Sequence, residues 1–425
     1  MFGLGTVGSQ IADSLLTSQS RFARELGFSL RLKTIVIRDK DRDRPDVGPE
    51  VLVTDDPASI LEDPEIKIVI EVMGGEHPAV EYIERAIAAG KGVVTANKEV
   101  IAKHGRSLIA SATAGGTGLR FEAAVGGGTP IVGPLVTELA ANQISVVRAI
   151  INGTTNYMLS LMAQHGESYE NALAQAQELG YAEAQPSSDV EGTDAAYKLA
   201  ILCSLAFGTE IKHDDVFCEG ITRLRQVDFV YARELGYAIK LIAVGRIEHG
   251  RVQARVHPAF LPSSSQLAGV DGVLNAVELS GDLIGSMIIQ GPGAGGAPTA
   301  SAVLADLFQI GRFITSGANP SMGTDFIREL PVEPIDQLVT RYYVRLRVSD
   351  QPGVMARITT VLGVHRVSLA SVIQKEVLQS GELAEIVIVT HEATEASVQA
   401  ALVELDRLEA VYEIAALVRI EEPTA

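Results

Sequence analysis

The first eight residues constrain the fold of this chain more than any other segment. Gly3, Gly5 and Gly8 form a G-x-G-x-x-G motif that leads into a helix-like segment at residues 10–16. Glycines at this spacing allow a sharp turn, close approach to a pyrophosphate and tight packing of a helix on a strand. Strand-like and helix-like segments then alternate, at residues 30–39, 66–75, 79–90 and 91–98. This order predicts a parallel, doubly wound sheet that binds a dinucleotide.

Only Met1 and Phe2 precede the glycine motif, where a doubly wound sheet has its central first strand. We therefore expect a first strand that is cut short, by truncation of the chain or by a start codon chosen too late. Such a sheet would lose both stability and affinity for the cofactor.

The second predicted strand ends in Arg38 and Asp39. An acidic residue there accepts the ribose 2′-hydroxyl of NAD, whereas an arginine favours the 2′-phosphate of NADP. Arg38 thus predicts NADP, Asp39 leaves NAD open, and a solvated arginine is the alternative. Lys98 follows the strand-like segment GVVTAN, and ligands of such sheets lie beyond the carboxyl ends of the strands. We therefore expect Lys98 to reach the cofactor or the substrate, with a solvated helix-start lysine as the alternative.

Charge and cysteine content narrow the class of protein. The 425 residues carry a formal net charge of −18, which argues against nucleic acid or an anionic membrane as a partner. No apolar run approaches the roughly 18 residues that span a bilayer, so we expect a cytoplasmic protein. Cys203 and Cys218 are too few for a disulfide framework and belong to no metal-ligand motif. We expect both thiols to be buried.

A helix-like segment in the middle of the chain carries an isolated cation. Lys198 is the only charged residue from Ala195 to Phe207, and the apolar residues surround the helix, which predicts burial. Asp194 lies four residues earlier, on the same helix face. Because a buried cation is costly unless it is paired, this pair is a candidate reactive site. The alternative is an ordinary exposed ion pair.

Two turns before this helix suggest ligand contacts. The segment FEAAVGGGTP, residues 121–130, combines a carboxylate with exposed backbone carbonyls, which could form an oxygen cage for a hard cation. A tight crossover between domains is the simpler interpretation. Residues 153–156, GTTN, open a helix whose hydroxyl and N–H groups could hold a carboxylate or simply cap the helix.

The residues around Lys198 resemble the signature of a known family. The spacing Ala176-x3-Gly180-Tyr181-Ala182, then Pro186-x2-Asp189-Val190-x-Gly192-x-Asp194-x3-Lys198, is similar to that of homoserine dehydrogenases. With GLGTVG, TANK, FEAAVGGGTP and INGTTNYML, the resemblance covers essentially the first 320 residues. Gln185 departs from the family, which usually has Asp or Asn before the proline, and we interpret it as altered turn capping.

The resemblance implies reduction of L-aspartate 4-semialdehyde to L-homoserine with NADP or NAD, a step of threonine, methionine and isoleucine biosynthesis. It makes Lys198 the catalytic acid/base and Asp194 its partner. Glu183 would bind the ammonium group of the substrate. The other substrate contacts would be Thr154, Asp189 and Lys98. The cofactor would contact Gly3, Gly5, Thr6, Val7, Gly8, Arg38, Lys98 and Gly293. A structural sodium ion would be held by Glu122, Val125, Gly127 and Thr129.

The same resemblance implies the domain organisation. A Rossmann-like NAD(P)-binding domain spans residues 1–129 and is completed by about 297–325. An α+β substrate-binding and dimerisation domain spans 130–296, in which residues 240–247 and 254–261 read as strands of a sheet. The family implies a homodimer or homotetramer.

The last segment, residues 341–425, has its own pattern. Strand-like and helix-like segments in the order βαββαβ predict an antiparallel ferredoxin-like sheet backed by two helices. With the turn Asp350–Val354 the segment resembles an ACT domain, which implies an amino-acid effector such as threonine. The alternative is a domain that only dimerises or stabilises the chain.

Two other functions remain open from the sequence. The chain could reduce another small amino aldehyde, or it could be a nucleotide- and amino-acid-sensing regulator without catalysis. The presence of both Asp194 and Lys198 argues against the sensor, because a sensor does not need a buried lysine.

Overall fold

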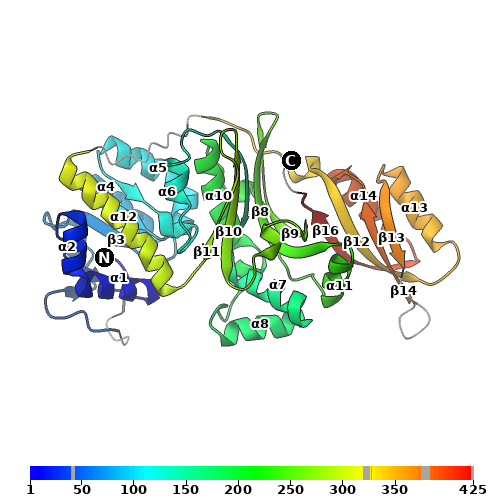
Figure 1. Ribbon diagram of the computed structural model, residues 1–425, viewed down its shortest axis with the longest axis horizontal. Helices are drawn as coiled ribbons and strands as arrows, with labels where there is room; N and C mark the ends of the chain where they lie inside the picture. Colours follow the sequence, from blue (N-terminus) through cyan, green and yellow to red (C-terminus); the bar gives the residue numbers. More distant parts are fainter. Residues whose placement is uncertain (40–43, 319–325, 327, 375–382, 423–425) are drawn as a thin grey trace. The chain divides into compact units, whose positions relative to one another are not determined.

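The computed structural model describes residues 1–39, 44–318, 326, 328–374 and 383–422 (Figure 1). The chain forms two compact units. The first unit contains residues 1–153, 196–216 and 273–330, and the second contains residues 154–195, 217–272 and 331–425. The domain boundaries 1–129, 130–296 and 341–425 stay a prediction.

A parallel sheet forms the base of the first unit. Its strands are β1 (Thr34–Val36), β2 (Leu52–Thr54), β3 (Ile68–Glu71), β4 (Gly92–Thr95) and β5 (Leu119–Arg120). β1 pairs with β2, and β3, β4 and β5 pair in that order, all in parallel. Phe2 is fully buried and bridges Val36 and Glu71, so the short segment before the glycine motif takes the central position. The predicted doubly wound architecture is confirmed.

Six helices from early and late parts of the first unit accompany this sheet. They are α1 (Thr6–Thr17), α2 (Gln19–Leu26), α3 (Ala58–Leu61), α4 (Ala79–Ala88), α5 (Lys98–Ala114) and α12 (Gly296–Ser316). α12 lies against α1 (Figure 1), and Val303, Leu307 and Ile310 share one buried cluster with Ile11 and Ile35. The late helix therefore shares the core of the parallel sheet and α1.

The rest of the first unit contributes three antiparallel strands and one buried helix. The strands are β6 (Ile144–Ile150), β10 (Leu274–Gly281) and β11 (Gly285–Pro292), in the order β11-β10-β6. The turn after β5 contains η1 (Glu122–Ala124) and α6 (Val132–Val136), and η2 (His213–Asp215) follows α10 (Thr193–Phe207). Most of α10 belongs to this unit.

The second unit has two parts that share one sheet. The first part contains α7 (Gly153–His165), α8 (Tyr169–Glu178), α9 (Ser187–Val190), β7 (Phe217–Cys218), α11 (Gln226–Glu234), β8 (Tyr237–Glu248), β9 (Arg251–Pro262) and η3 (Leu267–Gly269). β8 and β9 pair along their whole length, which confirms the two strands predicted at residues 240–247 and 254–261.

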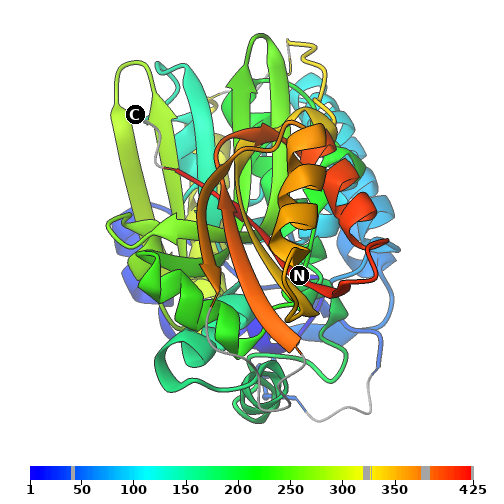
Figure 2. The same cartoon turned by 90° about the vertical axis from the view of Figure 1, so that its right-hand side faces the viewer.

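The second part has the predicted βαββαβ order. Its elements are η4 (Ile335–Gln337), β12 (Val339–Ser349), α13 (Val354–Val364), β13 (Leu369–Gln374), β14 (Leu383–Thr390), β15 (Ala393–Thr394), α14 (Glu395–Leu405) and β16 (Val411–Ile420). The antiparallel order β16-β12-β14-β13 is ferredoxin-like, and Figure 2 shows α13 and α14 side by side on one face. β16 also pairs with β9 through Arg419 and Ile420, so this sheet continues into the preceding domain.

Within the described ranges, no helix is both long and apolar enough to cross a membrane.

Candidate active site

The surroundings of Gly3, Gly5 and Gly8 explain why glycine occupies each position of the first motif. Gly3 has a φ of +97°, and a Cβ there would lie 2.8 Å from the Val72 carbonyl oxygen. A Cβ at Gly8 would lie 2.4 Å from the Gly3 carbonyl oxygen. A Cβ at Gly5 would meet nothing within 4 Å. Gly3 and Gly8 therefore allow tight packing, and the open space at Gly5 suits a closely approaching pyrophosphate.

The start of α1 provides hydrogen-bond donors at this open space. Thr6 and Val7 are its first two residues, and no side chain caps its N-terminus. Backbone N–H groups of a helix start, together with the helix dipole, form a favourable site for a phosphate. At the end of β1, Arg38 and Asp39 are both exposed. The neighbouring Lys40 and Arg42 lie outside the described residues.

A buried polar cluster lies at the carboxyl ends of β3 and β4. Glu71 is fully buried; its Oε2 accepts from the Thr95 hydroxyl at 2.5 Å and its Oε1 from the Met73 N–H at 2.8 Å. Burial raises the pKa of Glu71. Asn97 Nδ2 donates to the Gly75 carbonyl at 2.7 Å, and Asn97 Oδ1 accepts from the Val100 N–H at 3.2 Å.

This cluster fixes the position of Lys98. Asn97 caps α5, so Lys98 is the first residue of the helix at the carboxyl edge of the sheet, and it is half-buried. The position of Lys98 at this edge agrees with the prediction from the sequence, whereas Glu71 was not among the predicted residues. The sequence contains one indication of Glu71, because it is the single carboxylate in the mainly apolar segment 66–75. A carboxylate in a buried strand is costly unless a structural or functional contact compensates for its burial.

The helix α10 is buried, as predicted. Leu199, Leu202 and Cys203 are fully buried, and Asp194 is 4% exposed. Lys198 is half-buried, and its Nζ donates to the Ile151 carbonyl oxygen at 2.9 Å. Asp194 and Lys198 lie four residues apart and so occupy one face of the helix.

The acceptor of Lys198 lies beside the late glycine-rich turn. Ile150 pairs with Ala276 across the β6–β10 ladder, so Ile151 follows next to Asn275. A Cβ at Gly293 would lie 2.2 Å from the Asn275 side chain, so only glycine permits this approach. The first unit thus brings together Lys198, Ile151 and Gly293 around the end of one ladder.

Asn275 is a second residue that sequence analysis missed. It is 1% exposed, and neither Oδ1 nor Nδ2 has a hydrogen-bond partner in the described part of the chain. Leaving a buried amide unpaired costs about 1–3 kcal/mol. A polar ligand that provides both a donor and an acceptor would remove this cost. In the sequence the residue is one asparagine in a strand, which carries no distinguishing signal.

The remaining predicted substrate residues belong to the second unit. Thr154 is buried in the first turn of α7, and its hydroxyl donates to the Tyr181 carbonyl at 2.6 Å. Glu183 is exposed in the loop that follows, and Asp189 is half-buried in α9. The N-cap of α9 is Pro186, whose side chain has no group that could cap the helix. The altered capping expected from Gln185 stays a prediction.

A further buried lysine, Lys240, supports this region. Its Nζ donates to the Val270 carbonyl at 2.6 Å, to Asp271 Oδ1 at 2.8 Å and to Asn156 Oδ1 at 3.3 Å. Burial lowers the pKa of Lys240, and Asp271 opposes that shift. The three oxygens satisfy the ammonium group, so Lys240 connects β8 to the helix start at Asn156.

The turn predicted to bind a cation, residues 121–130, has a carboxylate that is already hydrogen-bonded and three carbonyl oxygens that are not. Glu122 Oε1 accepts from the N–H groups of Ile131 and Val132 at 2.6 and 2.9 Å, and its Oε2 accepts from the Gly133 N–H at 2.6 Å. Its carboxylate therefore caps α6. The carbonyl oxygens of the other three predicted ligands receive no hydrogen bond from any described residue: Val125, Gly127 and Thr129. The described ranges contain no cluster of three His, Cys, Asp or Glu side chains suited to a metal.

The prediction that both cysteines are buried is wrong for Cys218. Cys203 is buried, and burial raises its pKa. Cys218 is exposed on the two-residue strand β7, and its Sγ donates to the Glu191 carbonyl at 3.2 Å. β7 is only two residues long and pairs with β9 at the edge of the sheet. The side chain of Cys218 is therefore not covered by a neighbouring strand on its other side, which explains its exposure.

Comparison with known proteins shows which family has this combination of domains. Family models described as homoserine dehydrogenase NAD-binding domain, homoserine dehydrogenase and ACT domain match residues 3–122, 130–308 and 342–410. The chain belongs to the homoserine dehydrogenase family. As a homoserine dehydrogenase it is an oxidoreductase that uses a nicotinamide cofactor to interconvert aspartate semialdehyde and homoserine in amino-acid biosynthesis.

Individual relatives agree over nearly the whole length. The homoserine dehydrogenases of Synechocystis sp. and Pseudomonas aeruginosa are 44% and 40% identical, with 99% of this chain and 98% of each relative covered. The crystal structure of a homoserine dehydrogenase from Thiobacillus denitrificans has a TM-score of 0.92 at 39% identity and covers 99% of this chain and 97% of its own. A hyperthermophilic archaeal homoserine dehydrogenase mutant in complex with NADPH covers 73% of this chain and 96% of its own, with a TM-score of 0.62 and 28% identity.

Proposed function

We propose that Lys198 is the acid/base of the reaction and that Asp194 is its partner. The cofactor, when bound, supplies the hydride for the aldehyde carbon. The carbonyl oxygen of the substrate then gains negative charge and needs a proton from a group about 3 Å away. The half-buried ammonium of Lys198, hydrogen-bonded to Ile151, supports this assignment because it is held at a fixed place rather than in solvent.

The residues present fit a dinucleotide with its nicotinamide near Gly293. The open backbone at Gly5 and the uncapped start of α1 suit the pyrophosphate, with Gly3, Thr6, Val7 and Gly8 shaping the loop. The unpaired amide of Asn275 offers one donor and one acceptor, which match those of a carboxamide. Lys98 stands at the same edge of the parallel sheet.

We assign the substrate ammonium group to Glu183, with Thr154 and Asp189 in the same pocket. Changing Glu183 to glutamine is expected to raise KM for aspartate semialdehyde roughly ten- to hundredfold, because hydrogen bonds to charged groups contribute about 1.5–3 kcal/mol. The turnover number should change little. Glu178→Gln, an exposed residue of the same unit, is the control and should retain the wild-type KM. An unchanged KM in Glu183→Gln would remove the assignment.

We also propose that the cofactor is NADP, selected by Arg38. The exposed guanidinium at the end of β1 supports binding of a 2′-phosphate. The variant Arg38→Ala should raise KM for NADPH about tenfold or more and leave KM for NADH nearly unchanged. Arg24→Ala, an exposed arginine of α2, is the matched control. Equal effects on the two cofactors would contradict the selection.

A sodium ion at the turn after β5 completes the proposed site. The free carbonyl oxygens of Val125, Gly127 and Thr129 are suitable donors for a hard cation. Glu122 contributes negative charge nearby, although its oxygens are already engaged by three N–H groups.

We further propose a cytoplasmic homodimer or homotetramer that is inhibited by threonine. An ACT domain is typical of amino-acid effector binding, and threonine is a product of the pathway that homoserine supplies.

A further inference from the structure

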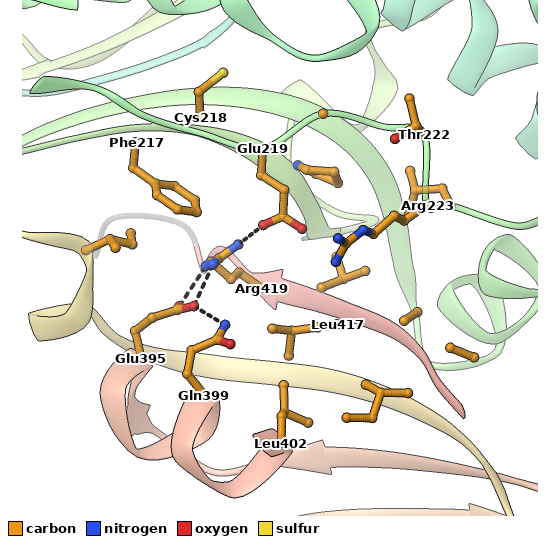
Figure 3. Close-up of a pocket in the computed structure, with 18 of the residues that line it drawn as sticks. Phe217, Cys218, Glu219, Thr222, Arg223, Glu395, Gln399, Leu402, Leu417 and Arg419 are labelled. Carbon is orange, nitrogen blue, oxygen red and sulfur yellow. Dashed lines mark hydrogen bonds and ion pairs between the residues drawn. The ribbon is translucent and has the colours of Figure 1, made fainter. Parts of the chain in front are cut away.

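Two kinds of buried carboxylate occur in this protein. The first kind has a cation beside it: Figure 3 shows Arg419 between Glu219 and Glu395, and its Nη1 and Nη2 donate to one oxygen of each at 2.6 Å. Glu71, at the end of β3 in the first unit, is of the second kind. It is fully buried and forms no ion pair with any residue in the described ranges. Because a buried carboxylate without a cation is costly, neighbouring groups have to offset that cost.

Neutral donors from two adjacent segments hold the Glu71 carboxylate. Its Oε1 accepts from the Met73 N–H at 2.8 Å, and its Oε2 accepts from the Thr95 hydroxyl at 2.5 Å. The first donor belongs to the loop after β3, and the second ends β4, the strand that pairs with β3. Burial raises the pKa of Glu71, and these hydrogen bonds oppose that shift. The short distance to Thr95 is typical of a hydroxyl that donates to an ionised carboxylate.

The contacts of Glu71 extend to the start of the helix that carries Lys98. Thr95 Oγ1 donates to Glu71 and accepts from the Asn97 N–H at 3.0 Å. Asn97 is the N-cap of α5, and its Nδ2 donates to the Gly75 carbonyl at 2.7 Å. The loop after β3 and the first turn of α5 are therefore joined by hydrogen bonds around the Glu71 carboxylate.

The same loop also contacts the glycine motif. The Val72 N–H donates to the Phe2 carbonyl at 3.0 Å, and a Cβ at Gly3 would lie 2.8 Å from the Val72 carbonyl oxygen. Gly74 and Gly75 follow, each with a φ of +76°, and a Cβ at either position would meet nothing within 4 Å. The loop thus packs against the motif at its first residue and has open space beside its backbone at the two glycines.

The strand order places this loop at the nicotinamide half of the cofactor site. Phe2 bridges β1 on one side and β3 on the other, so the strand order reverses at Phe2. Dinucleotides bind across the crevice at such a reversal, with the adenosine ribose at the end of the strand that follows the glycine motif, here β1. The carboxyl ends of β3 and β4 are left for the nicotinamide half.

We infer that Glu71 is a positioning residue for the nicotinamide half of the cofactor. It holds the loop 72–75 and the first turn of α5 in one arrangement, so that the open backbone of the loop and the side chain of Lys98 meet the cofactor at fixed places. Glu71 is fully buried, so it acts on the cofactor only through these segments. The inference rests on the proposed cofactor site at Gly5 and Lys98.

Calorimetric titration of the full-length protein with NADPH and with 2′,5′-ADP tests this role, because 2′,5′-ADP contains only the adenosine half of the cofactor. Glu71→Gln should weaken NADPH binding about tenfold and leave 2′,5′-ADP binding unchanged, since an amide has one oxygen where two donors converge. Thr95→Val should have the same effect, because it removes the same hydrogen bond without changing the charge. Thr95→Ser keeps the hydroxyl and should bind both ligands as wild type. Glu84→Gln, at an exposed position of α4, is the control and should also bind as wild type.

The two ligands separate positioning from a general structural effect. Equal loss of affinity for both ligands in Glu71→Gln and Thr95→Val would indicate a general defect and would overturn the inference. Wild-type affinity for NADPH in both variants would overturn it as well. Titration of wild type tests the proposed cofactor site by itself: if wild type binds no NADPH, that site is refuted, and the role of Glu71 with it. If wild type binds NADH more tightly, NADH and ADP replace the two ligands and the same outcomes apply.

Discussion

Replacing Lys198 with alanine is expected to lower kcat for NADPH-dependent reduction of aspartate semialdehyde by about 10²- to 10⁴-fold, the usual contribution of a positioned acid or base. The ammonium group is held at the Ile151 carbonyl at 2.9 Å. A water molecule in the space left by the side chain would lack both its charge and its fixed position. Steady-state oxidation of NADPH at saturating substrate measures the effect.

The matched control is Lys212→Ala, which removes an exposed lysine just after α10. It should retain wild-type turnover. The affinity of Lys198→Ala for NADPH should also stay near wild type, because the assigned role concerns the substrate oxygen. If Lys198→Ala turns over at the wild-type rate, Lys198 is not the acid/base.

Changing Arg345 to methionine is expected to destabilise the second unit by about 3–5 kcal/mol, because it leaves a buried charge without a partner. Asp228 of α11 is fully buried and accepts from Arg345 Nε at 2.7 Å and from Nη2 at 3.1 Å. Arg345 Nη1 also donates to Glu385 Oε2 at 3.0 Å. Urea unfolding followed by circular dichroism measures the free energy of unfolding.

The chain provides a matched control on the same strand. Arg347 also belongs to β12, but its ion pair with Glu413, at 3.2 Å, is exposed on both sides. Exposed pairs contribute about 0–1 kcal/mol, so Arg347→Met should unfold almost as wild type. If the two variants lose the same free energy of unfolding, burial of the Arg345–Asp228 ion pair does not determine how much the pair stabilises the protein. Deletion of residues 341–425 is a poorer test of the ACT domain, because it removes the partners of both Asp228 and Glu219.

Local patterns predicted much of the fold and indicated candidate residues for the site. The glycine motif requires a specific backbone path, and the alternation of strand-like and helix-like segments leaves few arrangements besides a doubly wound sheet. The charge-free surroundings of Lys198 indicated a buried helix. In the last domain, the order of elements was sufficient for the ferredoxin-like sheet.

Residues whose role depends on distant partners were not predictable. Arg345 and Arg347 alternate in the same strand, so they share one face, yet only Arg345 meets a buried carboxylate 117 residues away in sequence. Asn275 carries no signal in the sequence until the β10–β11 hairpin and the turn after it bring it against Gly293. The pairing of β16 with β9, which makes the ACT domain part of a larger sheet, is a short contact at Arg419 and Ile420 and leaves no periodic signal.

The most direct test of the account is the product formed by the wild-type enzyme. NADPH and L-aspartate 4-semialdehyde should yield L-homoserine, one molecule for each NADPH oxidised. The kcat/KM for this substrate should exceed that for other small amino aldehydes, such as glutamate 5-semialdehyde. No homoserine, or a higher kcat/KM with another aldehyde, would contradict the assigned reaction.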